Sequence, residues 1–395
     1  MSARISRLIS TCLAAVAALA LGASAGMAQA PVRIGIALSQ TGSLADSAEH
    51  YRKSVALWQE QANARGGILG RQVELVMYDD RSDPGTAVKL YERLITVDKV
   101  DLLLGPFGSA STSAASPVAE KHKMVMMNGG GAARTIHARG FRHLFQTVSP
   151  PDTYVEGVFP LAAKAGFKTI ALTSKDYPAG RDLEKSIRTL SAASGLKLLE
   201  VAYYPAGTTD YASHIARARE LKPDIWVING SPNEAIEMVR QMKAMNYMPK
   251  MFVSNGAAQE DFISAVGKDG EYVVGMSLYE PMLKTKDNAA FVAAFKAKWG
   301  YEPGYYAAMG WAMATVLEEA VRKAGAIDQA KLAAVLRELR TETPFGPYAV
   351  DETGLQIAKK GLIVQIRNGV REIIWPDEVA SVQPVLSAPG WQERR

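Results

Sequence analysis

The chain has 395 residues, of which 48% are hydrophobic and 22% charged, and its formal net charge is +5 at pH 7. This balance is typical of a soluble globular protein, and it excludes a disordered chain, a collagen and a polytopic membrane protein. A charge this mild, with no basic run, also argues against a nucleic-acid partner.

The first segment has the order of features found in a secretory signal peptide. Arg4 and Arg7 precede an apolar run from Leu8 to Leu21, and small residues follow up to Ala30. The run is shorter than the roughly 20 residues that a membrane span needs, so a permanent anchor is not expected.

Cleavage of this segment is expected after Ala28, which makes residues 1–28 the signal peptide. Cys12 is the only cysteine and leaves with it. The mature chain therefore has neither disulfides nor thiol chemistry, and its stability must come from a hydrophobic core.

In the mature chain, short β-rich runs alternate with amphipathic stretches, a pattern that indicates parallel sheets covered by helices. Strands are predicted at 32–38, 73–78, 100–104, 124–127 and 145–148. After Pro150-Pro151 the pattern restarts, with strands at 169–173, 197–203, 225–228, 251–253 and 272–278. The sequence therefore predicts two α/β lobes with a crossing near Ser149–Asp152.

The last third of the chain changes pattern. Helices are predicted at 288–299, 305–324 and 329–339, and strands follow at 362–366 and 372–375. These elements are too few for a third domain, so we expect them to return to the two lobes, and several such crossings would form a hinge. Residues after Pro376 read as an irregular surface tail.

No catalytic or metal-binding pattern emerges, so the sequence predicts no enzyme, no metal and no cofactor. The five histidines are scattered without ligand spacing. Asp83 reads as a helix N-cap before Pro84, not as part of a metal motif. Ser109 lacks the glycine pattern of a nucleophile elbow, and Gly129-Gly130-Gly131 lacks the lysine of a phosphate loop.

Two stretches rich in small residues, Gly105–Ser113 and Asn128–Ala133, follow predicted strands. Open α/β sheets bind ligands at this edge, and backbone N–H groups with the hydroxyls of Ser109 and Ser111 could hold a carboxylate there. Close packing of helix against strand would require the same small residues. Spacing alone leaves both interpretations open.

Several motifs, taken in their order along the whole mature chain, favour a ligand site over close packing alone. They are SQTGSLA at 39–45, NARGGILGR at 63–71, Tyr78 to Pro84, Gly105-Pro106 with Ser109, Gly207 to Tyr211, and Phe345-Gly346-Pro347 with Asp351 to Gly354. Together these resemble the periplasmic solute-binding proteins of ABC importers, of the leucine/isoleucine/valine-binding type.

The resemblance implies the type I periplasmic binding protein fold, in which two doubly wound parallel-sheet lobes are joined by a hinge of three crossings. The first lobe is expected at 31–148 plus 281–345, the second at 149–280 plus 346–375, and the tail at 376–395. It also implies a periplasmic monomer, not inserted in the membrane, that closes on a small-molecule ligand. The protein would deliver that ligand to inner-membrane permease subunits with their ATPases.

The same resemblance places the ligand site in loops of both lobes. The expected residues are Phe107, Gly108, Ser109, Gly130, Gly131 and Ala132 from the first lobe, and Tyr177, Ser231, Asn255 and Gly256 from the second. Ala132 stands where amino-acid-binding members have a threonine, and Asn255-Gly256 stands where they have an acid for the α-ammonium.

These departures change the expected ligand. A buried ammonium needs an anion, and Glu280 or Asp46 could swing in as a substitute, although the pattern predicts neither. We therefore expect a small carboxylate or neutral polar compound, including aromatic acids, with Phe107 and Tyr177 as walls. A true leucine/isoleucine/valine-binding protein and a ligand sensor of the same fold remain the alternatives. Tyr305, Tyr306 and Trp311 could pack the hinge or roof the pocket.

Overall fold

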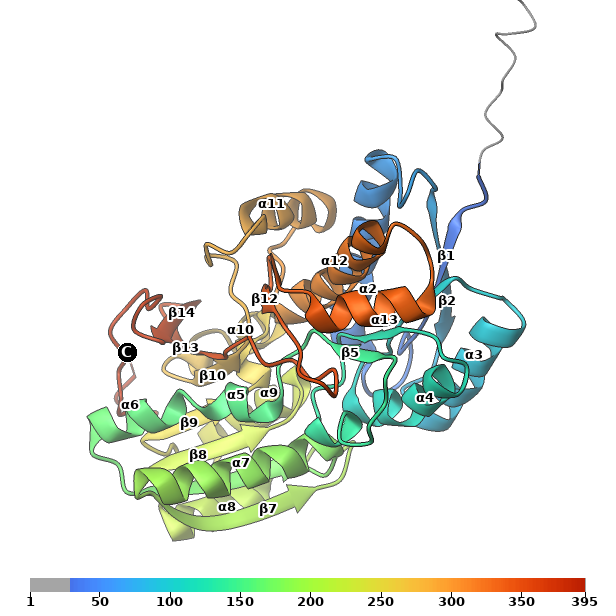
Figure 1. The fold of residues 1–395 in the computed structure, drawn as a ribbon. Coiled ribbons are helices and arrows are strands. Elements are labelled where there is room, and N and C mark those ends of the chain that lie inside the picture. Colours follow the sequence, from blue (N-terminus) through green and yellow to red (C-terminus); the bar gives the residue numbers. More distant parts are fainter. Residues whose placement is uncertain (1–28, 395) are drawn as a thin grey trace, which may run out of the picture.

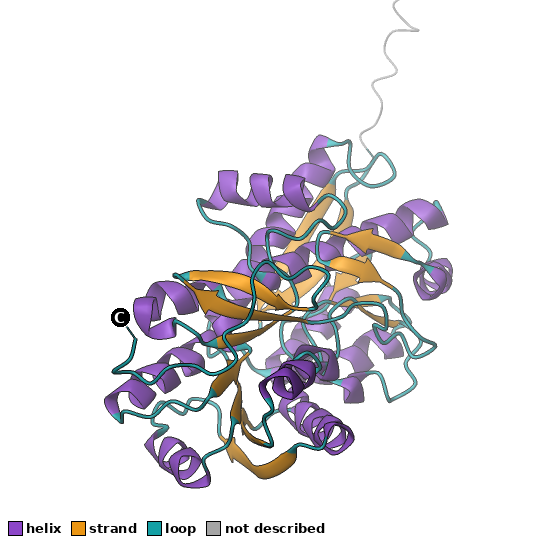
Figure 2. Cartoon of the chain, turned by 90° about the vertical axis from the view of Figure 1, so that its left-hand side faces the viewer, coloured by secondary structure: helices purple, strands orange, loops and turns teal. Residues whose placement is uncertain are grey.

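The chain forms two lobes, each built on its own β-sheet, in a computed structural model that describes residues 29–394 (Figures 1 and 2). The expected signal peptide, residues 1–28, lies outside the described residues. Within the described part of the chain, no helix combines the length and the apolar character needed to cross a bilayer.

The first lobe contains five parallel strands in the order β2-β1-β3-β4-β5. Their bounds are β1 Val32–Leu38, β2 Val73–Asp79, β3 Leu102–Leu104, β4 Met126–Asn128 and β5 Leu144–Gln146. Ile34 and Ile36 face one apolar cluster, whereas Ala37 faces another on the opposite side of the sheet. This burial on both faces explains the continuous apolar runs in the sequence.

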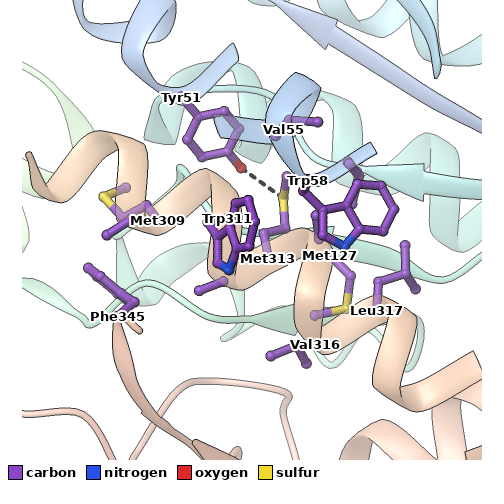
Figure 3. Packing of buried hydrophobic residues seen from close by; sticks show 14 of the residues in the cluster. Tyr51, Val55, Trp58, Met127, Met309, Trp311, Met313, Val316, Leu317 and Phe345 are labelled. Carbon is purple, nitrogen blue, oxygen red and sulfur yellow. Dashed lines mark hydrogen bonds between the residues drawn. The ribbon is translucent and has the colours of Figure 1, made fainter. Parts of the chain in front are cut away.

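Helices cover both faces of this sheet. They are α2 Ala45–Ala64, α3 Pro84–Thr96, α4 Ser109–Lys121, α11 Asn288–Trp299, α12 Tyr305–Ala324 and α13 Gln329–Glu338. Although it comes late in the sequence, α12 packs beside α2 (Figure 1). Figure 3 shows the contact, where the hydroxyl of Tyr51 donates to the sulfur of Met313 at 2.7 Å. Gly310 makes it possible, since a Cβ there would lie 2.7 Å from the carbonyl oxygen of Tyr51.

The second lobe contains seven strands in the order β14-β13-β10-β9-β8-β6-β7. Their bounds are β6 Thr169–Lys175, β7 Lys197–Tyr204, β8 Ile225–Asn229, β9 Met251–Ser254, β10 Val274–Ser277, β13 Leu362–Arg367 and β14 Val370–Trp375. Strands β6 to β10 are parallel, as expected. The helices are α5 Pro151–Val155, α6 Val158–Ala165, α7 Pro178–Ser194, α8 Ala212–Leu221, α9 Pro232–Ala244 and α10 Glu260–Val266.

Two antiparallel pairings, β10 with β13 and β13 with β14, extend the predicted parallel sheet at one edge. Only Asn368 and Gly369 separate β13 from β14, and both have positive φ, 54° and 76°. A two-residue Asn-Gly turn of this kind joins antiparallel strands, whereas parallel strands need a long crossover.

A short hairpin, β11 Thr341–Thr343 with β12 Gly346–Tyr348, was not predicted. The hydroxyl of Tyr348 donates to the carbonyl oxygen of Leu336 on α13 at 3.1 Å, so the hairpin packs with the first lobe. Residue 346 was expected to begin the second lobe. We propose instead that the third crossing lies between β12 and β13.

The tail lies along the second lobe. Gln365 on β13 exchanges hydrogen bonds with the backbone of Val385, at 2.8 and 2.9 Å. Further on, the indole of Trp391 donates to the carbonyl oxygen of Tyr247 at 2.8 Å. These contacts fasten the irregular segment without adding a strand.

Candidate functional site

A cavity of about 320 Å³ lies between the lobes, at the carboxyl ends of their parallel strands. The segments after β1, β3 and β4 line it from the first lobe, and those after β6, β8 and β9 line it from the second. Because parallel strands direct their connecting loops to the same edge, this is where open α/β sheets place ligands.

Eight of the ten residues expected at the site line this cavity, namely Phe107, Gly108, Ser109, Gly130, Ala132, Tyr177, Ser231 and Asn255. Gly131 and Gly256 do not. The N–H of Gly131 donates to the Oδ1 of Asn128 at 2.7 Å, so it is used inside its own loop. Gly256 packs so closely that a Cβ would lie 2.4 Å from the carbonyl oxygen of Ser231. Both glycines are therefore explained by packing.

In the first lobe, helix α4 begins at the cavity. Gly108 precedes it with a φ of 92°, and its N–H donates to the carbonyl oxygen of Gly130 at 3.1 Å, which joins the two expected ligand loops. The Oγ of Ser109 accepts the N–H of Ala133 at 3.2 Å. Helix N-termini carry partial positive charge, so this wall can hold an anion.

Aromatic rings form much of the remaining wall. Phe107 packs edge-on against Tyr306, with ring centroids 5.2 Å apart, and Tyr306 packs against Tyr305 at 4.5 Å. Both tyrosines line the cavity, which favours the roof interpretation for them. Trp311 instead packs against Phe291, with centroids 4.9 Å apart, and does not line it.

The hydroxyl of Tyr177 donates to the Oδ1 of Asn229 at 3.2 Å. Burial raises the pKa of Tyr177 and that of Tyr306. Both phenols therefore stay neutral and keep their hydrogen-bonding protons at physiological pH. The wall therefore offers a ligand both apolar ring surface and hydroxyl groups.

The second lobe also contributes Lys175, which the sequence analysis missed. Its side chain lines the cavity, and its Nζ lies 3.2 Å from the Oε1 of Glu234 and 5.4 Å from the ring centroid of Tyr177. Lys175 ends strand β6, one of the edges where ligands were expected. That position was visible in the sequence, but the direction of a long side chain was not.

The two acids suggested for an ammonium do not serve the cavity. Glu280 is buried and accepts from the Nε of Arg371 at 2.9 Å, and neither residue lines the cavity. The Oδ2 of Asp46 accepts from the Nδ2 of Asn233 at 3.0 Å, and Asp46 does not line the cavity either. Within residues 29–394, no group of three or more histidine, cysteine or acidic side chains is arranged to hold a metal ion.

Hydrogen bonds join the lobes around the cavity. The Asp46–Asn233 pair links α2 of the first lobe to α9 of the second. The backbone N–H of Arg134 in the first lobe donates to the Oδ2 of Asp182 on α7 at 2.8 Å. These contacts hold the two lobes together beside the cavity.

Comparison with known proteins agrees with this arrangement. A family model described as "Periplasmic binding protein" matches residues 31–370. A leucine-, isoleucine-, valine-, threonine- and alanine-binding protein of Pseudomonas aeruginosa is 28% identical over 355 residues, which cover 89% of this chain and 92% of that protein.

Solved structures show the same fold. The leucine-binding protein LivK of Thermotoga maritima superposes with a TM-score of 0.79 at 23% identity, over 87% of this chain and 97% of that one. A solute-binding protein from an ABC transporter of R. palustris, in complex with benzoate, also gives 0.79 at 21% identity, over 89% and 99%.

Proposed function

We infer that the chain, which belongs to the periplasmic binding protein family, captures a small carboxylate with an apolar or aromatic body. It would deliver this ligand to an ABC importer. It would be exported by its signal peptide and act in the periplasm as a monomer. Inner-membrane permease subunits, driven by their ATPases, would then receive the ligand from the closed protein.

One observation supports this ligand class above others. Of the described residues that line the cavity, only Lys175 and Asp176 carry a formal charge. Asp176 is exposed and accepts from the Nε of Arg181 at 2.8 Å, whereas Lys175 is mostly buried, with 14% of its side chain exposed. The enclosed part of the cavity wall therefore presents an ammonium and no carboxylate to a ligand, although that ammonium also pairs with Glu234, which does not line the cavity.

The remaining walls fit the body of such a ligand. Phe107, Tyr177 and Tyr306 give ring surface from both lobes. A ligand that touches both lobes binds the closed form better than the open one, so binding shifts the equilibrium toward closure. Closure removes the apolar body from water, which stabilises the complex. None of these steps makes or breaks a covalent bond, in keeping with a binding protein and not an enzyme.

A thermal-shift screen tests the proposal directly. Mature protein, residues 29–395, is unfolded and refolded to remove bound solute and then mixed with benzoate, 3,4-dihydroxybenzoate, leucine or alanine. A ligand that binds only the folded state raises the melting temperature, and we expect the aromatic carboxylates to do so. Isothermal titration calorimetry then gives the affinity of each hit.

Ser109→Ala tests the first-lobe loop. A hydrogen bond to a charged group contributes roughly 1.5–3 kcal/mol, so we expect affinity to fall about tenfold or more. Ser111→Ala is the control, because Ser111 is buried in the same helix but does not line the cavity. Equal ligand affinities for the two variants would show that Ser109 does not bind the ligand.

A branched-chain amino acid is the second candidate, because the relative from Pseudomonas aeruginosa bears that name. Tight leucine binding that depends on one acidic residue would favour it and overturn the carboxylate proposal. Chemical turnover of any bound compound would instead indicate that the protein is an enzyme.

A further inference from the structure

In the second lobe, the wall of the pocket includes the ammonium group of Lys175. The Nζ of Lys175 lies 3.2 and 3.3 Å from the two carboxylate oxygens of Glu234, and both side chains are largely buried, with exposed fractions of 14% and 10%. The ring of Tyr177 lies 5.4 Å from the same Nζ. A carboxylate and an aromatic face are the two kinds of group that stabilise a buried cation.

Glu234 is held in place by groups other than Lys175. Its carboxylate accepts the backbone N–H of Ser231, while the hydroxyl of Ser231 accepts the backbone N–H of Glu234, which completes a capping box for α9. The hydroxyl of Tyr204 lies 3.5 Å from the Oε2 of Glu234. The carboxylate of Glu234 is therefore fixed beside Lys175, and of these two residues only Lys175 lines the pocket.

We propose that Lys175 determines specificity by filling the cation position of the pocket in place of a ligand ammonium. The pocket then accepts carboxylates that lack an α-amino group and rejects α-amino acids. This inference rests on the proposed function and names the ligand class of that same site.

Electrostatics gives the reason for the rejection. Two ammonium groups near one carboxylate repel each other, and the repulsion is strong where water is excluded. A second buried ammonium would also need its own anion to offset the loss of hydration. Asp176, the other charged residue at the pocket, is exposed and engaged by Arg181. A carboxylate without an amino group avoids both costs.

Matched ligand pairs measure the effect of the amino group alone. Leucine is compared with 4-methylpentanoate, and phenylalanine with 3-phenylpropionate, by calorimetry at neutral pH. Wild-type protein is expected to bind at least one of the carboxylates at least tenfold more tightly than the amino acid of its pair. If neither member of either pair binds, the protein does not bind carboxylates with these apolar groups. That result would contradict both the proposed function and the inference that rests on it.

Lys175→Met is expected to reverse the preference. It keeps a long apolar side chain but frees the carboxylate of Glu234, so amino-acid affinity should rise at least tenfold while carboxylate affinity falls. Lys243→Met is the control, because Lys243 is on α9, pairs with Asp269 at 2.7 Å and does not line the pocket. A purely structural role would lower both affinities in parallel. That result would overturn the inference and leave the proposed function intact.

Glu234→Gln provides a second test that does not depend on the folding of Lys175→Met. Glutamine also serves at this position of a capping box, so helix α9 keeps its cap. The ammonium of Lys175 would lose its counter-charge, and we expect tighter carboxylate binding with continued rejection of amino acids. Improved amino-acid binding in this variant would contradict the inference.

Discussion

The imidazole Nε2 of His50 lies 3.2 Å from the Oδ2 of Asp261, and the two residues belong to different lobes. His50 is on α2, which packs in the first lobe, and Asp261 is on α10, which packs against α9 in the second. The Nδ1 of His50 also lies 3.0 Å from the hydroxyl of Tyr301, which fixes the ring. Opening of the lobes would separate this pair.

We expect His50→Ala to weaken ligand binding about two- to fivefold, since a partly exposed pair contributes up to about 1 kcal/mol. The control is His122→Ala. His122 forms an equivalent contact with Glu92, 3.0 Å away, but both residues lie in the first lobe. Calorimetry with the same ligand should show the loss for His50→Ala alone.

The same pair predicts a pH dependence. The hydrogen bond with His50 lowers the pKa of Asp261 despite the opposing effect of burial. A carboxylate whose pKa is lowered in the closed form stabilises that form above its ordinary pKa, and the effect is lost as the pH falls through the lowered value. The difference in affinity between wild type and His50→Ala should therefore shrink as the pH falls through the lowered pKa of Asp261. A constant difference would contradict a role for the ionised carboxylate.

Gly256→Ala should destabilise the fold. The added Cβ would lie 2.4 Å from the carbonyl oxygen of Ser231 and 2.9 Å from the Cβ of Ala235, so the backbone must move. Overpacking of this kind costs roughly 1–3 kcal/mol, which urea unfolding can measure. For comparison, Gly85→Ala meets nothing closer than 3.4 Å, and we expect it to change stability little. Similar losses in the two variants would argue against the close approach.

Asp224 joins the amino ends of three neighbouring strands. It accepts from the N–H groups of Lys168 and Thr169, at 2.8 and 3.1 Å, and from the Nζ of Lys250 at 2.7 Å. Burial alone would raise the pKa of Asp224, but the ammonium of Lys250 and these N–H groups outweigh it and lower the pKa to about 2. The folded state therefore favours the ionised form.

Asp224→Ala should lower the free energy of unfolding by about 2–3 kcal/mol at neutral pH, because the N–H groups lose their acceptor. The contribution is fully present above the unfolded-state pKa of about 3.9 and is lost as the pH falls through about 2. Urea unfolding at several pH values should show wild type approaching the variant in acid. Asp377→Ala, which removes only an exposed pair with Lys164, should have little effect at any pH.

Lys359 lies between β12 and β13 with its ammonium buried, 4.4 Å from the ring centroid of Phe345. Burial lowers its pKa to about 7, well below the value of an exposed lysine. Between that value and about 10 the unfolded chain binds the extra proton, so stability should rise with pH over this range. Lys359→Met should raise the melting temperature at pH 7 and remove that rise.

The neighbouring Lys360 provides the control, because it is exposed. Lys360→Met should leave both the melting temperature and its pH dependence unchanged. A lower melting temperature for Lys359→Met would show that the ammonium is stabilised where it lies, and it would refute the expected cost of burial.

Much of the fold follows from local patterns. Asp83 was predicted as an N-cap before Pro84, and its side chain accepts the N–H of Thr86 at 2.6 Å. The helices at 288–299 and 305–324 were predicted with the bounds they have, because apolar periodicity and a final glycine mark them. The antiparallel β13–β14 hairpin was missed, although Asn368-Gly369 between two apolar runs is a strong turn signal.

The site was harder to predict than the fold. Loops after strands identified where a ligand would lie, but small residues there have two causes. A Cβ would lie 2.7 Å from the carbonyl oxygen of Pro106 at Gly130 and 2.7 Å from the side chain of Thr112 at Gly131, yet only Gly130 also lines the cavity. The direction of Lys175 depends on Glu234, which is distant in sequence, and no local pattern encodes that pairing.

Because β10 pairs with β13, cutting the chain at one point cannot produce two fragments that each contain a complete lobe. Val274–Ser277 of β10 find their outer partners only at Leu362–Gln365, and the first lobe likewise requires α12 from late in the sequence. Until those segments are synthesised, β10 has an open edge whose N–H and C=O groups can pair with another chain. Fragments that end before residue 362 should therefore tend to aggregate, and both lobes should complete their folding together, near the end of synthesis.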